Sequence, residues 1–384
     1  MKSYLLVAAD FVKTGGMDRA NFALADYLGR QGMQVHLVAH RVAPELLAMP
    51  NVKFHRVPKV ANSYLLGGPV LDWVGRSQAQ RIAKAGGRVL VNGGNCQWGD
   101  VNWVHYVHAA YRRESKAGLL HQLKTSVANK IDRAEERKAL QSARVIIVNS
   151  ERTKRDIIEK LAIPTESYDA PQKIHTVYYG IEPQLFYPAN PQERTELRHQ
   201  LGWSTSKLIV VFIGALGDRR KGFDTLFAAW QQLCADSDWD ADLVAIGTGA
   251  ELPLWQRRAT EVGIGSRIHF LGFRSDVPDL LRAADCLVAP TRYEAYGLGV
   301  HEALCCGLPA LVSATAGVAE RYPPHLGDLL ILDPENALDL AARLRRWREA
   351  IHQYSKMVST LSEELRGYTW DDMASNIVDK INNS

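Results

Sequence analysis

Apolar strand-like runs alternate with helix-like stretches along the whole chain, and this alternation restricts the fold more than any other feature. The runs are short, rich in Val, Ile and Leu, and nearly continuous. Strands of this kind are buried on both faces, as in parallel sheets with helices on either side. The expected strands are residues 3–9, 34–39, 52–57, 88–94, 101–108, 144–149 and 173–179 in a first set, and 208–216, 242–247, 267–272, 286–290, 309–314 and 329–332 in a second.

Two sets of strands predict two α/β domains, each a doubly wound parallel sheet. The length of 384 residues agrees, because it exceeds what one ordinary core holds. The pattern breaks near 185–205, and we draw the domains as residues 1–190 and 191–368. The composition, 46% hydrophobic and 23% charged, excludes a disordered chain, a collagen-like repeat and a coiled-coil rod.

Membrane and redox signals point to a cytoplasmic protein. No stretch approaches the roughly 20 apolar residues of a membrane span, and the N-terminus reads as a first strand, not as a signal peptide. The five Cys show no metal-ligand or C-x-x-C spacing, so we expect reduced, buried thiols.

The net charge of +4 hides two halves of opposite sign. Residues 1–190 carry 26 Lys and Arg against 16 Asp and Glu, whereas residues 191–384 carry 20 against 26. A basic first half is suited to phosphates, anionic lipid or an acidic acceptor. No motif points to nucleic acid.

The strongest chemical signal is the segment 286–309, CLVAPTRYEAYGLGVHEALCCGLP. A strand ends at Pro290, and ligands of open α/β sheets bind at the carboxyl ends of strands. A short helix from about Leu298 offers backbone N–H groups to an anion at its start. Glu294 and Glu302, seven residues apart, are suited to sugar or ribose hydroxyls. The alternative is a surface turn with two solvated glutamates.

This segment resembles the E-x7-E motif of retaining glycosyltransferases, in particular glycosyltransferase family 4. GALGDRRKGFDTL (214–226), KIHTVYYGIEPQLFYP (173–188), ARVIIVNSERTKRDI (143–157) and RIHFLGFRSDVPDLLRAADCLVAPT (267–291) resemble further family segments, so that the resemblance covers essentially the whole chain. It implies the GT-B fold, with two Rossmann-like domains facing a cleft. It also implies that residues 369–384, starting near Trp370, form a helix that crosses back to the first domain.

The resemblance implies a donor site on the second domain. Arg220 and Lys221, between a strand and a helix, would hold a pyrophosphate, and lone basic loops are otherwise often only exposed. Glu294 would position the sugar, and Glu302 would bind the ribose from the first turn of its helix. The donor-binding residues would be Gly15, Gly16, Gly214, Arg220, Lys221, Arg274, Glu294, Gly297, Leu298 and Glu302.

Three departures from the family pattern concern substrate details. Ala215 stands where the family often has Arg, and Arg220 is able to supply that charge. Tyr179 begins the Tyr-Gly-Ile-Glu version of the family's Asn-Gly-Ile-Asp. His301 replaces the usual aliphatic residue before the second glutamate.

In the first domain, Gly15 and Gly16 follow the first strand, either as a tight turn or as a backbone cradle for the transferred sugar. The chain has no G-x-G-x-x-G, which argues against a dinucleotide dehydrogenase. Strand alternation would place His105 and His108 on opposite faces of strand 101–108. We expect His108 to face the cleft and to join Glu294, Lys221 and Arg220 as a catalytic residue.

Two further segments are rich in charged residues. DSDWDAD (236–242) has overlapping D-x-D triplets, but it precedes a strand at its amino end, away from the ligand edge, so we expect no metal and no cofactor. The apolar stripe among basic residues in 113–141 predicts a long helix. It either faces the core or contacts anionic lipid.

The prediction is a hexosyltransferase that moves sugar from a UDP-, GDP- or ADP-sugar to a hydroxyl of a glycan or lipid-linked acceptor, with retention and without a metal. It would work in the cytoplasm or peripherally on the inner face of the membrane, in polysaccharide or glycolipid biosynthesis. The alternatives are a GT-B phosphorylase, a sugar-nucleotide epimerase and a non-catalytic nucleotide-sugar-binding partner.

Overall fold

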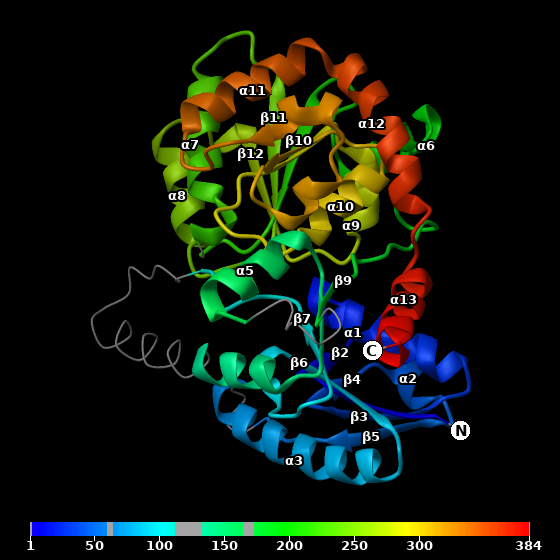
Figure 1. Cartoon of the computed structure of the whole chain (residues 1–384). Coiled ribbons are helices and arrows are strands. Elements are labelled where there is room, and N and C mark those ends of the chain that lie inside the picture. Colours follow the sequence, from blue (N-terminus) through cyan, green and yellow to red (C-terminus); the bar gives the residue numbers. More distant parts are fainter. Residues whose placement is uncertain (1, 60–63, 112–132, 164–172, 218, 384) are drawn as a thin grey trace. The chain divides into compact units, whose positions relative to one another are not determined.

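The computed structural model describes residues 2–59, 64–111, 133–163, 173–217 and 219–383. The described chain forms two compact units (Figure 1). The first consists of residues up to Gly180 and from Thr369 onward, and the second runs from Ile181 to Tyr368. The first boundary thus lies after Gly180, and not at residue 190 as expected from the sequence.

The first unit is built on a seven-stranded parallel sheet. From edge to edge its strands are β5 (Val52–Arg56), β3 (Gln34–Ala39), β1 (Ser3–Val7), β6 (Arg88–Asn92), β7 (Val101–Val104), β8 (Val145–Val148) and β9 (Ile174–Thr176). A small parallel pair, β2 (Asp10–Phe11) and β4 (Arg41–Val42), lies beyond β1 and β3 along the chain. The helices are α1 (Gly16–Arg30), α2 (Pro44–Leu47), α3 (Tyr64–Lys84), residues 133–142, α5 (Glu151–Leu161) and α13 (Trp370–Asn382), with the 3-10 turn η2 (Gly93–Asn95).

The second unit contains a six-stranded parallel sheet. Its strands, in spatial order, are β12 (Ile268–Gly272), β11 (Ala241–Ile246), β10 (Leu208–Ile213), β13 (Cys286–Ala289), β14 (Ala310–Ser313) and β15 (Leu330–Ile331). The helices are α6 (Pro191–Leu201), α7 (Phe223–Cys234), α8 (Leu252–Glu261), α9 (Val277–Ala283), α10 (Leu298–Cys305), α11 (Ala337–Glu349) and α12 (Ile351–Arg366), with 3-10 turns η3 (Arg219–Lys221), η4 (Gly265–Arg267), η5 (Gly317–Arg321) and η6 (Pro324–Leu329). The strand order reverses between β10 and β13, which is the point where ligands bind in open α/β sheets.

The two doubly wound parallel sheets confirm the predicted fold class, and each expected strand is present. Several strands end earlier than expected. β7 stops at Val104, so the predicted strand 101–108 is wrong beyond that residue. Alternation along a strand therefore says nothing about His105 and His108. The sequence analysis also did not anticipate α3, which contains Pro69.

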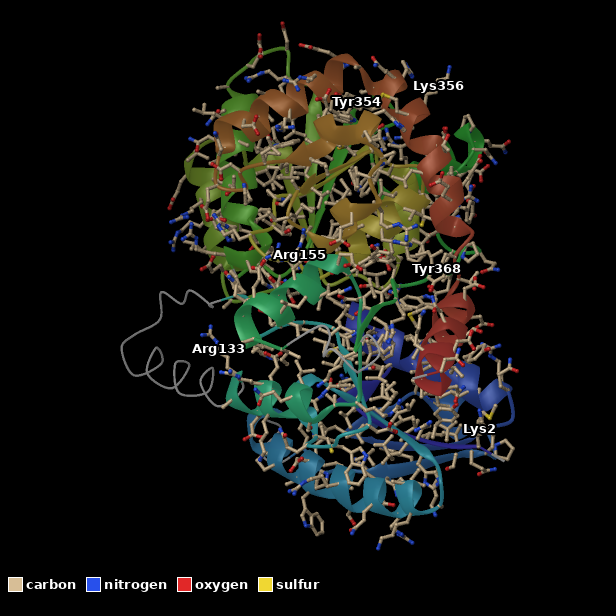
Figure 2. The ribbon with its side chains drawn as sticks, viewed as in Figure 1. Lys2, Arg133, Arg155, Tyr354, Lys356 and Tyr368 are labelled. Carbon is tan, nitrogen blue, oxygen red and sulfur yellow. The ribbon has the colours of Figure 1, made fainter. Side chains whose placement is uncertain are left out.

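Helix α13 belongs to the first unit. A capping box between Thr369 and Asp372 begins it, and Trp370 packs against Tyr179 with ring centroids 5.9 Å apart. Arg30 of α1 forms an ion pair with Asp371 at 2.5 Å. The chain passes from one unit to the other after Gly180 and after Tyr368. These two segments are neighbours, because the N–H of Ile181 donates to the carbonyl of Tyr368 at 3.2 Å; Figure 2 labels Tyr368.

Candidate functional site

The site of the second unit is formed by two loops at the reversal of strand order. One loop follows β10 and contains η3, and the other follows β13 and leads to α10. Because β10 and β13 are neighbours in the sheet, their carboxyl ends bring these loops together. The N–H of Arg292 donates to the carbonyl of Arg220 at 2.8 Å, which joins the two loops directly.

Lys221 and Glu294, which were both expected from the sequence, meet in this site. The Nζ of Lys221 lies 2.5 Å from Oε2 of Glu294, and the guanidinium of Arg220 lies 3.6 Å from the same oxygen. The side chains of Arg220, Lys221 and Glu294 are 18%, 20% and 17% exposed. Two cations therefore converge on one carboxylate at a partly open position, where an anionic ligand is able to compete for them.

A second set of charges holds these loops, and sequence reasoning missed it. Arg292 bonds to Asp224 at 2.7 Å and to Glu335, and Arg219 bonds to Asp224 at 3.0 Å. Burial would raise the pKa of Asp224, but Arg292 and Arg219 outweigh it and hold that pKa below its usual value. The hydrogen bond to Glu335 and, to a smaller extent, the one to Asp224 raise the pKa of Arg292. Arg292 thus keeps its charge and fixes η3 against the loop that carries Glu294.

Gly297, whose φ of 109° is left-handed, is the N-cap residue of α10, and no described side chain caps this helix. The first N–H groups of a helix have no intrahelical partner, so the N–H groups at Leu298 are suited to an anionic ligand. The carbonyl of Glu294 accepts from the N–H of Gly317 at 3.1 Å, which pins the loop before α10. Glu302 is 5% exposed and lies in the second turn of α10. The prediction that it lies in the first turn is therefore wrong, because Leu298 is the first residue of the helix.

His301 accounts for one departure from the family pattern. Its ring is buried and bonds through Nδ1 to the hydroxyl of Tyr296 at 2.7 Å. Burial, aided by Arg321, lowers the pKa of His301 to about 3. The histidine is therefore a neutral core residue bonded to a neighbouring tyrosine.

Two other predicted donor residues lie at the same sheet edge. Gly214 follows β10, and a Cβ there would lie 3.2 Å from Cγ of Lys221. Arg274 follows β12, two strands away from β10, and its Nε bonds to Asp276 at 2.7 Å. Among the described contacts, none joins Arg274 to Lys221 or Glu294.

In the first unit, Gly15 lies between β2 and α1, and Gly16 is the first residue of α1. Gly15 has a φ of 83° and is the N-cap of α1, which Gly16 begins. Asp18, in the first turn, was not singled out from the sequence; one of its buried carboxyl oxygens has no hydrogen-bond partner. Burial, with a smaller contribution from Asp10, raises the pKa of Asp18 to about 6.

The two histidines differ sharply in their surroundings. His105 is 7% exposed; its ring bonds to the hydroxyl of Tyr179 at 2.5 Å and to Asn21 at 3.2 Å. Burial lowers the pKa of His105 to about 3. The side chain of His108 is 45% exposed, and its Nδ1 lies 3.1 Å from the buried carboxylate of Glu136. His105 thus belongs to a buried network, whereas His108 presents a ring to the surface.

We therefore expect opposite effects from the two alanine variants. His105→Ala should lower the melting temperature, since a buried polar group that loses its partner costs about 1–3 kcal/mol. His108→Ala should leave melting and nucleotide binding nearly unchanged and lower kcat, as loss of a contact made near the transition state does. Melting, nucleotide binding and turnover are measured on both. Lost turnover with unchanged melting in His105→Ala, beside an active His108→Ala, would reverse the two assignments.

The remaining sequence candidates are structural where the structure describes them. Within DSDWDAD, Asp240 pairs with Arg348 at 2.6 Å and Asp242 with Arg267 at 3.0 Å, and Asp242 lies near the amino end of β11. Of the predicted helix 113–141, residues 113–132 lie outside the described residues, and residues 133–142 are helical. None of the described helices is long and apolar enough to cross a membrane.

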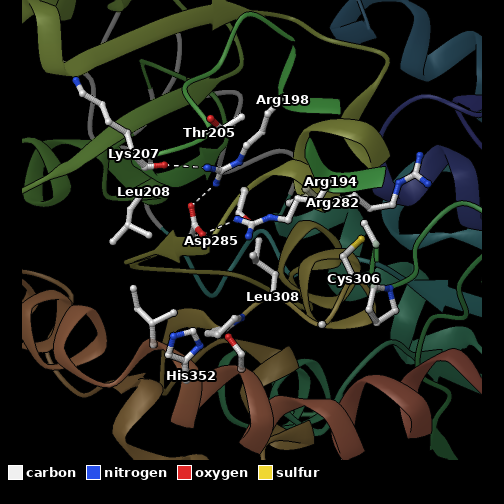
Figure 3. A pocket seen from close by; sticks show the side chains of 18 of the residues that line it. Arg194, Arg198, Thr205, Lys207, Leu208, Arg282, Asp285, Cys306, Leu308 and His352 are labelled. Atoms are coloured by element: carbon white, nitrogen blue, oxygen red, sulfur yellow. Dashed lines mark hydrogen bonds and ion pairs between the residues drawn. The ribbon is translucent and has the colours of Figure 1, made fainter. Parts of the chain in front are cut away.

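A cavity lies at the opposite, amino edge of the second sheet, and Figure 3 shows side chains that line it. Its volume is about 610 Å³. Arg194 and Arg198 both reach Asp285 there, at 2.5 Å and 2.6 Å, and Asp285 also accepts from the N–H of Ile209 at 2.7 Å. These charges satisfy one another and the backbone. They connect the start of β10 with α6. The candidate ligand site lies at the other end of the strands, in the loops described above.

Comparisons with known proteins give the family of this chain. The family model Glycosyltransferase Family 4 matches residues 14–185, and the model Glycosyl transferases group 1 matches residues 193–360. The D-inositol 3-phosphate glycosyltransferase 1 of Catenulispora acidiphila is 33% identical over 172 residues, which span 42% of this chain and 40% of that protein.

Solved structures match over the full length. Sucrose-phosphate synthase from Thermosynechococcus elongatus has a TM-score of 0.76 at 19% identity and covers 100% of this chain and 99% of its own. HepE of Anabaena, solved in complex with UDP and glucose, has a TM-score of 0.70 at 17% identity, and the match covers 100% of both chains. The fold is therefore GT-B, as the resemblance implied. With the two family models on either half, this chain belongs to glycosyltransferase family 4 and is a glycosyltransferase.

Proposed function

We propose that this enzyme transfers a hexose-type sugar from a nucleotide-sugar to a hydroxyl acceptor, with retention at the anomeric carbon and without a metal. The observation that carries the proposal is the convergence of Lys221 and Arg220 on Glu294, next to the uncapped start of α10. This combination offers two cations and backbone donors to a diphosphate, and a carboxylate to sugar hydroxyls.

In this mechanism the second unit stabilises the leaving group. Charge develops on the departing diphosphate, and preorganised donors aimed at that charge are usually the largest catalytic contribution. Arg220, Lys221 and the N–H groups near Gly297 and Leu298 would supply them. Glu294 would then exchange Lys221 for sugar hydroxyls and hold the sugar in place, rather than act as a nucleophile.

The first unit would supply the acceptor side. Gly15 and Gly16 form a turn at the carboxyl edge of its sheet, and His108 presents an exposed ring. We propose that the acceptor is a glycan or a lipid-linked glycan, met in the cytoplasm or at the inner face of the membrane. The excess of Lys and Arg in residues 1–190 supports an anionic partner.

The identity of the donor is open among UDP-, GDP- and ADP-sugars, and thermal stabilisation distinguishes them. A ligand that binds only the folded state at 100 times its Kd adds about 2.7 kcal/mol. We expect one nucleoside diphosphate to raise the melting temperature clearly and Lys221→Ala to lose the shift. Absence of stabilisation by any of the three would count against a nucleotide-sugar donor.

The phosphorylase and epimerase alternatives share the donor site but not the acceptor. Product formation from the nucleotide-sugar without an acceptor, or only with inorganic phosphate, would favour them. A non-catalytic partner would bind the nucleotide and release no product.

Glu302 should act through donor binding. Its carboxylate is buried on α10 and is able to accept two hydroxyl groups of a ribose. Glu302→Ala should therefore raise the donor KM more than it lowers kcat, as the loss of uniform binding does. Glu302→Gln, which keeps one acceptor oxygen, should lie between. A fall in kcat with unchanged KM would instead assign Glu302 to the chemical step.

Activity should survive chelation. The cations Arg220 and Lys221 supply the charge that a metal would otherwise bring, and Asp240 and Asp242 are already held by arginines at the other edge of the sheet. Turnover is measured before and after EDTA, with and without added Mg²⁺ or Mn²⁺. A strict requirement for either ion would overturn the metal-free part of the proposal.

A further inference from the structure

A second cavity opens in the first unit, at the carboxyl ends of β3 and β5. Its volume is about 530 Å³. Lys13, Arg41 and Arg56 line it, with Glu45 as the one carboxylate and Phe54 on its wall. It therefore lies on the edge of a parallel sheet where ligands bind, and cations outnumber acids around it.

The chain builds this cavity from short local elements. The small pair of β2 and β4 places Arg41 beside Asp10, and the loop after β2 carries Lys13. On β5, Phe54 and Arg56 are two residues apart, so they share the face that lines the cavity. Lys53 belongs to the opposite face of the same strand.

The three cations differ in how strongly they are held. Asp10, whose side chain is 2% exposed, accepts two bonds from Arg41 at 2.8 Å and 3.1 Å and so fixes the guanidinium. Lys13 pairs with Glu45 at 2.7 Å, and both side chains are more than half exposed. Such a surface pair contributes little and is easily exchanged. Arg56 makes no ion pair with another described residue.

The cavity is also close to the predicted position of the transferred sugar. Lys13 precedes Gly15 by two residues, which span at most about 7 Å of extended chain. An acceptor that reaches Gly15 with its hydroxyl is thus able to place another group among Lys13, Arg41 and Arg56.

We infer that this cavity binds a phosphate group of the acceptor. Two guanidinium groups and an ammonium group suit a phosphate, because guanidinium binds phosphate oxygens in a bidentate fashion and Lys adds a point charge. Phe54 offers an apolar wall to the carbon skeleton that carries the phosphate. The inference rests on the proposed transferase function and names the substrate class of its acceptor side.

The test measures binding, apart from turnover. Glucose 6-phosphate, glucose and glucuronate are titrated at constant ionic strength into the wild type, Arg56→Ala and Lys53→Ala. We expect glucose 6-phosphate alone to bind well, and Arg56→Ala to weaken it about 10- to 100-fold, the range for one charged hydrogen bond. Lys53→Ala, which removes the same charge from the other face of β5, should bind like the wild type.

Two outcomes would overturn the inference. One is equal binding of glucose, glucuronate and glucose 6-phosphate. The other is equal weakening by Arg56→Ala and Lys53→Ala, which would show only a general effect of charge. Vesicles with and without phosphatidylinositol form a second arm. Binding that depends on this lipid and on Arg56, without binding of glucose 6-phosphate, would place the phosphate on a lipid head group.

The same experiment separates this inference from the proposed function. Lys221→Ala should lose the nucleoside diphosphate and keep glucose 6-phosphate, and Arg56→Ala should show the converse. If no nucleoside diphosphate binds the wild type, the transferase proposal fails. If it binds, and neither glucose 6-phosphate nor the vesicles with phosphatidylinositol bind, only the acceptor inference fails.

Discussion

Replacing Lys221 by alanine should lower turnover by about 10²- to 10³-fold, the range for losing one preorganised donor that stabilises developing charge. In the present structure its Nζ lies 2.5 Å from Glu294, so the variant removes both the contact to a diphosphate and the partner of this carboxylate. Arg220, whose guanidinium lies 3.6 Å from the same carboxylate, remains in the variant and should account for the residual turnover.

Lys207 provides the matched control for this variant. It directly precedes β10, at the amino end of the same sheet, and its Nζ is also paired with a carboxylate, that of Asp242, at 3.1 Å. Lys207→Ala should change turnover by no more than about twofold, since Arg267 still holds Asp242. Initial rates over a range of donor concentrations decide the comparison. Equal rates in Lys221→Ala and wild type would contradict the assignment.

Replacing Gly222 by alanine should destabilise the second unit by about 3 kcal/mol or more. Gly222 has a φ of 72°, and a Cβ there would lie 1.8 Å from the carbonyl oxygen of Pro290. The left-handed conformation costs a non-glycine residue about 1–2 kcal/mol, and relief of the clash adds about 1–3 kcal/mol. Because Gly222 follows Lys221 and Pro290 precedes the loop of Glu294, the variant should also separate the two halves of the site.

Gly202→Ala is the control that separates the steric clash from the cost of the left-handed backbone conformation. Gly202 has a φ of 69°, and a Cβ there would meet nothing within 4 Å. Gly202→Ala should therefore cost only about 1–2 kcal/mol. Thermal and denaturant unfolding of both variants measure the difference in stability loss. Turnover at a temperature where both are folded shows whether the loop of Lys221 keeps its position. Equal stability losses would show that the clash with the carbonyl of Pro290 contributes nothing to the destabilisation.

Much of this site could be predicted from the sequence because its signals are local. A glycine after a strand, the pair Arg220 and Lys221, and two glutamates around a short helix stand within continuous segments, and the alternation of strands and helices places them at one sheet edge. The order of the strands then brings Lys221 to Glu294, as the structure shows.

Other features depend on contacts that the sequence does not display. Arg292 stands inside a recognised motif, but its partners Asp224 and Glu335 lie 68 and 43 residues away. Helix α3 escaped notice because Pro69 and several glycines interrupt its pattern. The end of β7 at Val104 could not be located either, since the apolar residue Val107 continues the pattern beyond it.

The central claim is that a nucleotide-sugar binds through its diphosphate at the reversal of strand order in the second sheet. A crystal structure with the nucleoside diphosphate that stabilises the protein most tests it directly. We expect diphosphate oxygens within hydrogen-bond distance of Lys221, Arg220 and the N–H groups at the start of α10. The ribose should contact Glu302, and Lys221 should have moved away from Glu294. A nucleotide bound elsewhere, with the pair of Lys221 and Glu294 intact, would contradict it.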